Sequence, residues 1–329
     1  MPTRLLPSVS SWEQWAALFV DTAVWRPVIE HLWSGGAILS AATGVKGIES
    51  IAPGFPGTCA VFVINESVVV KFFPPMVAGD YTRERAVYRL LESRVTEMPR
   101  LLASGVFDDR QPWPWLITSF RPGAAWRDVR TLVPEAQRLE LGRALGERLR
   151  QVHDTPLPTR AEWLPSDLWR QLVAKRLAVA LEEVRAKAIL PQVLVEDARR
   201  LLQATDWHAP PPRLLHADLT EDHVLVEARA SGWAMSGLID WADAEVGASD
   251  YEWVALYFGF CGGDTTLFRA VLAGYDPGRL PPPRERLLAF TLLHRFGSAI
   301  IAHALPEPVR RELAGLDELA GRLFPDIDP

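Results

Sequence analysis

The sequence predicts a two-lobed α+β protein, with a small β-rich N-terminal lobe followed by a larger, mainly helical lobe. Apolar runs typical of strands lie between residues 51 and 120, and long segments rich in Leu, Ala, Arg and Glu follow them. A β-rich part followed by a helical part is the usual order in such folds. A length of 329 residues also suggests two lobes, which we place at residues 1–119 and 120–329.

In the first lobe, residues 10–34 carry apolar residues at helical spacing and predict a leading helical segment. The runs 59–64 and 68–73 are rich in β-branched and aromatic residues, and the turn between them predicts a β-hairpin. Helical periodicity returns at 82–91. A further buried strand is expected at 115–120.

In the second lobe, four stretches have helical propensity or periodicity: 134–153, 166–205, 250–272 and 284–304. Three short apolar strands are expected between them, at 213–215, 224–226 and 237–239. The strands matter most for function, because polar residues follow two of them directly.

Composition limits the class of function. A net charge of −6 argues against nucleic acid as a partner and suits a cationic small substrate better. Neither a signal peptide nor an apolar run long enough to span a membrane is expected, and two isolated cysteines are typical of a reducing compartment. We therefore expect a cytoplasmic protein that does not bind membranes and is a monomer or weak dimer.

Two aspartates follow predicted strands. Asp218 lies in His216-Ala217-Asp218 after the strand at 213–215, and Asp240 directly follows the strand at 237–239. Phosphoryl transfer needs one carboxylate to orient the attacking hydroxyl and accept its proton, and another to hold Mg²⁺. The strand context favours this pair over the alternative, in which both are unrelated turn residues.

A lysine and a glutamate form the third candidate element. Lys71 lies in an otherwise apolar strand, where an isolated ammonium is costly, and Glu84 shares a predicted helix face with Val87 and Leu91. Such a pair positions nucleotide phosphates in kinases. The alternative is that Lys71 reaches solvent from an edge strand and Glu84 is solvated.

Several separated motifs resemble the aminoglycoside phosphotransferase family. HADLTEDHVLVE followed by GLIDWADAEVG is similar to the family's catalytic and metal-binding loops, and VVVKFF, RERAVYRLL and WPWLITSFRPG extend the resemblance across most of the chain. WPWLITSFRPGAAWRDV and LLAFTLLH are most similar to hygromycin B kinases. The resemblance implies a protein-kinase-like fold and an O-phosphotransferase using ATP or GTP, with an antibiotic as the acceptor.

The resemblance also assigns roles to residues. It implies that Asp218 is the catalytic base, that His216 supports its loop and that Asp240 binds Mg²⁺. It places Lys71 on the phosphates, paired with Glu84. The remaining nucleotide contacts that we expect are the glycine-containing loop at Gly57 and Thr58 and, for adenine, the carbonyl of Ser119 and the N–H of Arg121.

The sequence departs from the family pattern at two positions. His223 stands where the family usually has Asn as the second metal ligand, which makes Mn²⁺ a possible alternative to Mg²⁺ because imidazole suits softer metals. Macrolide kinases are similar in having His there. Ala248 replaces a usual Asp, and Ser249 or Asp250 is expected to supply the missing loop-anchoring hydrogen bonds.

The acceptor is left open by the sequence. Four carboxylates near the expected site are candidates for binding substrate amines, with simple surface solvation as the alternative: Asp243, Glu245, Glu221 and Asp222. His153 ends a predicted helix, where a capping role is expected. The competing functions are an aminocyclitol kinase, a macrolide or metabolite kinase, and a nucleotide-binding pseudokinase.

Overall fold

The computed structural model describes residues 4–34, 37–55, 57–158, 168–208 and 211–327, and it divides into two compact units. The first contains Met1–Pro122 together with Leu238–Asp243, and the second contains Gly123–Gly237 and Ala244–Pro329. The first unit thus continues past residue 119 and also takes in the short later segment that carries Asp240.

The first unit is built on a five-stranded sheet with the order β1-β2-β3-β5-β4. The strands are β1 (Ile51–Pro53), β2 (Ala60–Ile64), β3 (Val68–Phe72), β4 (Leu101–Asp108) and β5 (Pro112–Ser119). The predicted hairpin is confirmed, because β2 and β3 pair antiparallel. Asn65 and Glu66 turn the chain with φ values of 51° and 50°, the positive φ that tight hairpin turns require.

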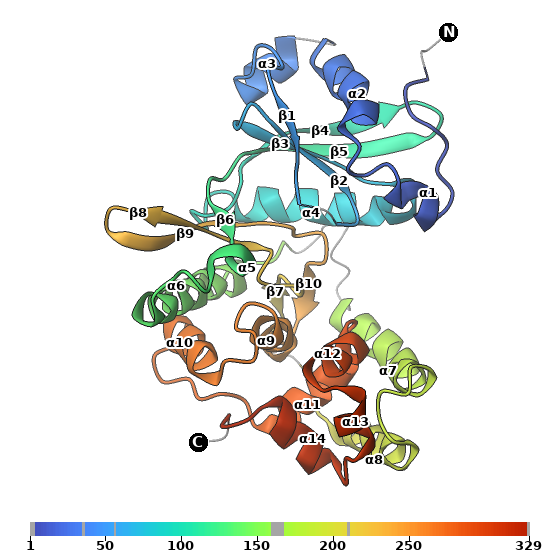
Figure 1. Cartoon of the computed structure of the whole chain (residues 1–329), viewed down its shortest axis with the longest axis vertical. Coiled ribbons are helices and arrows are strands. Elements are labelled where there is room, and N and C mark those ends of the chain that lie inside the picture. Colours follow the sequence, from blue (N-terminus) through green and yellow to red (C-terminus); the bar gives the residue numbers. More distant parts are fainter. Residues whose placement is uncertain (1–3, 35–36, 56, 159–167, 209–210, 328–329) are drawn as a thin grey trace. The chain divides into compact units, whose positions relative to one another are not determined.

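The two faces of this sheet have different neighbours. Val68, Val70 and Phe72 of β3 are buried in a core that also contains residues of helix α2 (Thr22–Ser34). Lys71 alternates to the other face, as the period of two along a strand requires. Helix α4 (Ala78–Leu91), preceded by a 3-10 turn at Pro75–Val77, runs along the sheet on the side opposite α2 and α3 (Ala37–Thr43) (Figure 1).

The leading segment is helical, as predicted for residues 10–34, and it consists of two helices. Helix α1 (Trp12–Ala16) ends before α2 begins at Thr22. Asp21 explains the break, because its carboxylate accepts hydrogen bonds from the N–H groups of Ala23 at 2.9 Å and Val24 at 3.3 Å. An aspartate in this position starts a new helix and disfavours continuation of the preceding one.

The second unit is mainly helical and has two small sheets, β10-β7 and β6-β8-β9. Its helices are α5 (Trp126–Val129), α6 (Glu135–His153), α7 (Leu168–Ala186), α8 (Gln192–Ala204), α9 (Ser249–Phe258), α10 (Thr265–Tyr275), α11 (Arg284–Leu293), α12 (Gly297–Ala304), α13 (Glu307–Arg311) and α14 (Leu316–Leu323). Its strands are β6 (Ala124–Ala125), β7 (Arg213–Leu215), β8 (Val224–Arg229), β9 (Gly232–Leu238) and β10 (Glu245–Gly247).

Three predicted helical stretches are each divided in two: 166–205, 250–272 and 284–304. The last of these breaks between α11 and α12, where His294 has an extended backbone with φ −57° and ψ 143°. The stretch 166–205, whose first two residues lie outside the described residues, breaks between α7 and α8, where Ala188 has a positive φ of 48° and Pro191 caps α8. The stretch 250–272 breaks between α9 and α10, where Gly262 and Gly263 have positive φ. Residues with positive φ cannot continue a right-handed helix.

Helices α6 and α10 pack backbone to backbone. A Cβ on Gly146 would lie 2.0 Å from the carbonyl oxygen of Val271, and one on Gly274 would lie 2.0 Å from that of Arg143. Only glycine allows this approach. None of the helices in the described part of the chain has the length and apolar character needed to cross a membrane.

Candidate active site

In the first unit, Lys71 lies between two carboxylates. Its Nζ is 2.7 Å from Glu84 Oε2 and 2.9 Å from Asp240 Oδ1. The predicted Lys71–Glu84 ion pair is therefore present, and the alternative of a Lys71 that reaches solvent from an edge strand is excluded, because β3 lies in the interior of the sheet. Asp240 joins the same ammonium, so the cluster holds the residue expected to bind metal beside the residue expected to contact phosphate.

Burial decides the electrostatics of this cluster. Burial raises the pKa of Glu84 to about 7, although the Lys71 ammonium opposes the shift. For Lys71 the balance is reversed: burial favours the neutral amine, but the carboxylates of Asp240 and Glu84 together hold the pKa well above its usual range. Lys71 is therefore the permanent cation of the cluster. A cation held next to the nucleotide's expected position suits binding of phosphate.

The segment that carries Asp240 is fixed to its own unit by backbone contacts. Arg83 of α4 donates from Nη1 to the carbonyl of Ala242 at 2.8 Å, and the N–H of Leu238 donates to the carbonyl of Glu97 at 3.2 Å. Asp240 itself has a φ of 63°, which is uncommon for a residue other than glycine. A strained backbone held by its surroundings is typical of a functional position. The sequence pattern gives no indication of this contact of Arg83.

The predicted nucleotide contacts at the two ends of the sheet are also in the first unit. Gly57 and Thr58 are exposed on the loop between β1 and β2, and a Cβ on Gly57 would meet no atom within 4 Å. At the end of β5, the N–H groups of Ser119 and Phe120 donate to the carbonyls of Arg100 and Ser67. The carbonyl of Ser119 and the N–H of Arg121 stay the predicted adenine contacts.

In the second unit, the side chain of Glu252 on α9 holds the backbone at the start of the loop 216–223 through two hydrogen bonds. Glu252 Oε2 accepts from the N–H of His216 at 2.6 Å, and Oε1 accepts from the N–H of Ala217 at 3.2 Å. Glu252 is fully buried. Ala217 has a positive φ of 65°, so this carboxylate holds a strained backbone directly before Asp218.

Glu252 also corrects the expectation that Ser249 or Asp250 anchors the loop. Asp250 instead forms an ion pair with Arg286, 2.7 Å from its Nε. His153 lies in the same buried group as Glu252: its Nε2 is 3.7 Å from the Glu252 carboxylate and its Nδ1 is 3.0 Å from the Tyr275 hydroxyl. His153 is the last residue of α6, where a capping role was expected, and its ring also takes part in this buried network.

His223 contacts the same loop as Asp218. Its Nδ1 is 2.5 Å from the main-chain carbonyl oxygen of Asp218, 3.2 Å from Thr220 Oγ1 and 3.9 Å from Asp218 Oδ2. A carbonyl oxygen only accepts, so Nδ1 carries the proton in this contact. A metal bound by His223 would consequently be bound through Nε2. The His216 and His223 rings stack with centroids 5.6 Å apart.

Two of the four candidate substrate carboxylates already face arginines of their own unit. Glu221 Oε2 is 3.0 Å from Arg130 Nη1, and Asp222 Oδ1 is 2.9 Å from Arg127 Nη2. These ion pairs reduce the charge that Glu221 and Asp222 present to a cationic substrate. Asp243 lies in the first unit's Leu238–Asp243 segment, and Glu245 begins β10 in the second unit.

A resident metal is compatible with the donors present. The Asp240 carboxylate supplies hard oxygen, and its side chain is 42% exposed. Among the residues that the structure describes, no group of three or more His, Cys, Asp or Glu side chains forms a ready cage. Mg²⁺ commonly uses only one or two carboxylates together with waters and substrate phosphates, so the residues fit an ion that arrives with a nucleotide.

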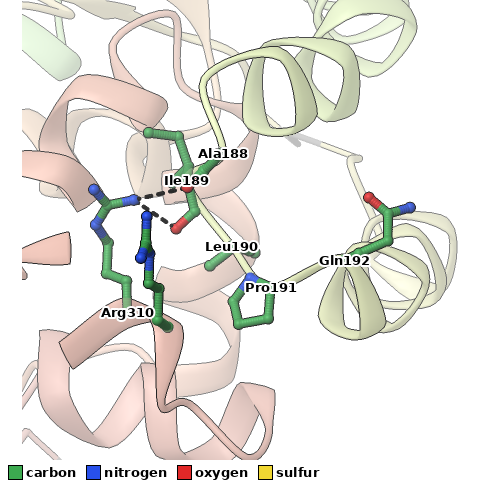
Figure 2. Close-up of a pocket in the computed structure, with 7 residues that line it drawn as sticks. Ala188, Ile189, Leu190, Pro191, Gln192 and Arg310 are labelled. Atoms are coloured by element: carbon green, nitrogen blue, oxygen red, sulfur yellow. Dashed lines mark hydrogen bonds between the residues drawn. The ribbon is translucent and has the colours of Figure 1, made fainter. Parts of the chain in front are cut away.

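A pocket of about 260 Å³ occurs elsewhere in the second unit, between the α7–α8 connection and α13 (Figure 2). Arg310 lines it and donates from Nη1 to the carbonyls of Ala188 and Ile189, at 3.1 and 2.8 Å, and from Nε to the carbonyl of Leu305. The guanidinium thus satisfies carbonyls near two helix ends. This pocket includes none of the predicted site residues.

Comparison with known proteins identifies the family. Solved structures with the same fold include the GDP and kanamycin complex of APH(2")-IIia, with 22% identity, a TM-score of 0.61 and coverage of 79% of this chain and 87% of the other. They also include the GDP complex of aminoglycoside 2'-phosphotransferase-IIIa, with 18% identity, a TM-score of 0.59 and coverage of 87% and 95%. Spectinomycin phosphotransferase APH(9)-Ia with ADP and spectinomycin has 17% identity, a TM-score of 0.52 and coverage of 89% and 93%.

At these identities the structural likeness establishes the fold, which confirms the predicted protein-kinase-like, two-lobed α+β architecture. The family itself is shown by sequence, because the profile of the APH phosphotransferase family matches residues 57–288, well over half of the chain. The matched range contains Lys71, Glu84, Asp218 and Asp240. The protein is a phosphotransferase, and it belongs to the APH phosphotransferase enzyme family.

Proposed function

We propose that this enzyme transfers the γ-phosphoryl group of ATP or GTP to a hydroxyl of an aminoglycoside or aminocyclitol antibiotic, such as hygromycin B. The observation that carries the proposal is the Lys71 cluster, in which one ammonium contacts both Glu84 and Asp240. A fixed cation beside a hard carboxylate suits a nucleotide's phosphates and their metal ion. The match to a phosphotransferase family supports the same reaction.

In the proposed reaction, Asp218 orients the acceptor hydroxyl and takes its proton. The hydroxyl oxygen forms a bond to the γ-phosphorus while the bond from that phosphorus to the β-γ bridging oxygen breaks, so the nucleoside diphosphate leaves. His216 and Glu252 hold the backbone beside Asp218, since Glu252 accepts the N–H of His216 at 2.6 Å. Lys71 neutralises phosphate charge, Gly57 and Thr58 contact the phosphates, and the Ser119–Arg121 edge receives the base.

Asp240 and His223 are the proposed metal ligands, with His223 binding through Nε2. Bound Mg²⁺ or Mn²⁺ would neutralise charge on the β- and γ-phosphates. Lys71 already holds Asp240 in place through the 2.9 Å contact to Oδ1. The chain's own contribution is therefore to keep a carboxylate preorganised before the nucleotide arrives.

The acceptor is proposed from chemistry and resemblance. The net charge of −6 suits a substrate with several amino groups. We assign the substrate amines to the four predicted carboxylates, Asp243, Glu245, Glu221 and Asp222, and of these Glu221 and Asp222 would exchange their contacts with Arg130 and Arg127 for the substrate. Two of the similar structures contain kanamycin and spectinomycin, respectively. His223 favours a macrolide as the second candidate, because macrolide kinases resemble this chain at that position.

The test is nucleotide turnover by the purified protein, with either ATP or GTP, across aminoglycosides, aminocyclitols, macrolides and small alcohols, and with Asp218→Asn as the control variant. We expect phosphorylated product with one aminoglycoside or aminocyclitol. The control should lose transfer by about 100-fold or more, the range for removal of a general base. Product with a macrolide alone would establish the second candidate. Nucleotide binding without transfer to any acceptor would contradict the proposal and indicate a pseudokinase.

A further inference from the structure

The loop between β1 and β2 is tied to the leading helix α1 by one buried hydrogen bond. Trp15 Nε1 donates to the carbonyl oxygen of Thr58 at 2.9 Å. Trp15 is only 1% exposed, and its ring packs against Trp25 and Trp113 with centroid distances of 6.1 and 5.4 Å. The indole cannot turn without disturbing this aromatic cluster, so it holds the Thr58 carbonyl in a fixed place.

The same loop is fixed at its beginning. The N–H of Gly54 donates to the carbonyl of Val61 at 2.7 Å, and a Cβ on Gly54 would lie 2.6 Å from the Val61 side chain. Val61 pairs with Lys71 across β2 and β3. The exposed loop is therefore held at both ends, by β2 at Gly54 and by Trp15 at Thr58, and it leads directly into the strand pair that presents Lys71.

Trp15 lies outside the part of the chain that matches the family profile, which begins at Gly57. We propose that Trp15 is a positioning residue for the nucleotide: its indole N–H sets the backbone of the loop that receives the phosphates. The inference rests on the proposed function, which assigns the loop at Gly57 and Thr58 to the phosphates. It adds a role for helix α1, since the Trp15 indole of this helix holds the carbonyl of Thr58.

The test compares Trp15→Phe with Trp33→Phe. Phenylalanine retains an aromatic ring and removes the indole N–H. Trp33 is the matched control, because it is also buried and its Nε1 donates at 3.2 Å to the carbonyl of Val45, which lies outside the loop. Each variant is measured by amide hydrogen exchange of residues 54–59 in the nucleotide-free protein, thermal melting, nucleotide KM and kcat.

We expect both variants to melt at lower temperature, and only Trp15→Phe to speed exchange in the loop. Loss of one buried hydrogen bond should raise the nucleotide KM of Trp15→Phe roughly five-fold, with kcat nearly unchanged. Equal loop exchange or equal KM in the two variants would overturn the inference. Failure of the proposed function is distinguishable, because wild-type protein would then not transfer phosphate, whereas loop exchange is measured without nucleotide.

Discussion

The two functional regions hold their key carboxylates in different ways. In the first unit, Asp240 is held by a cation, since Lys71 Nζ contacts its Oδ1 at 2.9 Å. In the second unit, the backbone before Asp218 is held by an anion, since buried Glu252 accepts N–H groups from His216 and Ala217. Both arrangements stabilise a residue with positive φ, Asp240 in one and Ala217 in the other.

The difference fits the roles that we propose for the two regions. A region that is proposed to receive phosphates and metal needs a charge, and Lys71 could exchange part of its contact with carboxylates for contact with phosphate. A loop that is proposed to present a base needs geometry more than charge, and two hydrogen bonds to a buried carboxylate fix geometry. We therefore expect damage to the first region to weaken nucleotide binding and damage to the second to slow transfer.

Glu252→Gln should show the largest effect on the second region. The two N–H groups reach different carboxylate oxygens, so the amide of Gln leaves one of them facing NH₂. An unsatisfied buried donor costs about 1–3 kcal/mol, which corresponds to roughly a 5- to 150-fold loss of kcat if the cost falls on the transfer step. Steady-state kinetics would measure it.

Asp250→Asn is the control for Glu252→Gln. Asp250 is on the same helix but pairs with Arg286 and not with the loop. It should retain kcat and nucleotide KM. If Glu252→Gln transferred phosphate as fast as Asp250→Asn, the function of the loop 216–223 would not depend on the Glu252 carboxylate.

Gly146→Ala sharpens the comparison by disturbing the second unit without touching either region. Its Cβ would meet the Val271 carbonyl oxygen at 2.0 Å, and such overpacking typically costs about 1–3 kcal/mol. Gly79→Ala on α4 is the control, because a Cβ there meets nothing within 4 Å. Thermal melting should show a loss for Gly146→Ala and no loss for Gly79→Ala. Equal melting temperatures would mean that α6 and α10 do not pack this closely.

A pH dependence of stability should distinguish the first region. The pKa of Glu84 is raised to about 7 by burial, from a usual 4.5. The folded state therefore binds this proton more tightly than the unfolded state, and the resulting stability is fully present below pH 4.5 and is lost as the pH rises through 7. Between these values the free energy of unfolding of the wild type should fall relative to that of Glu84→Gln. Both free energies would be measured by urea denaturation at several pH values. If they changed with pH to the same extent, the raised pKa of Glu84 would be refuted.

His223→Asn is expected to have the smallest effect and concerns the metal preference. Imidazole suits Mn²⁺ better than Mg²⁺, whereas the amide oxygen of Asn suits Mg²⁺. The wild type should thus show a several-fold higher ratio of Mn²⁺- to Mg²⁺-supported activity than the variant. Identical metal titrations of the two proteins would leave His223 only its contact with the Asp218 carbonyl.

The sequence predicted the first region better than the second for a physical reason. A lysine in an apolar strand and a glutamate on an apolar helix face are conspicuous, so the Lys71–Glu84 pair was accessible from the pattern alone. The role of Glu252 could not be predicted from the pattern, because the residues from Tyr251 to Tyr257 of α9 are all buried and show no polar face. Its partners are backbone N–H groups, which have no signature in sequence.

Contacts between segments that lie far apart along the chain also could not be predicted from the sequence. Arg83 does not belong to the helix face that Glu84 shares with Val87 and Leu91, yet its guanidinium contacts the carbonyl of Ala242. Trp15 lies in the leading helical segment, and nothing near it along the chain points to its contact with Thr58. Periodicity reports which face of an element is buried, and it does not report the partner.

The central claim is that the first region binds the nucleotide and the second carries out phosphoryl transfer. Its most direct test compares Lys71→Met with Asp218→Asn. Nucleotide affinity is measured by titration, and the rate of phosphoryl transfer is measured in single turnover at saturating nucleotide. Lys71→Met should weaken nucleotide binding by about ten-fold or more, because a charged contact to phosphate is lost. Asp218→Asn should bind nucleotide as the wild type does and transfer phosphate at least about 100-fold more slowly. Nucleotide affinity that falls equally in both variants, or transfer by Asp218→Asn at the wild-type rate, would contradict the account.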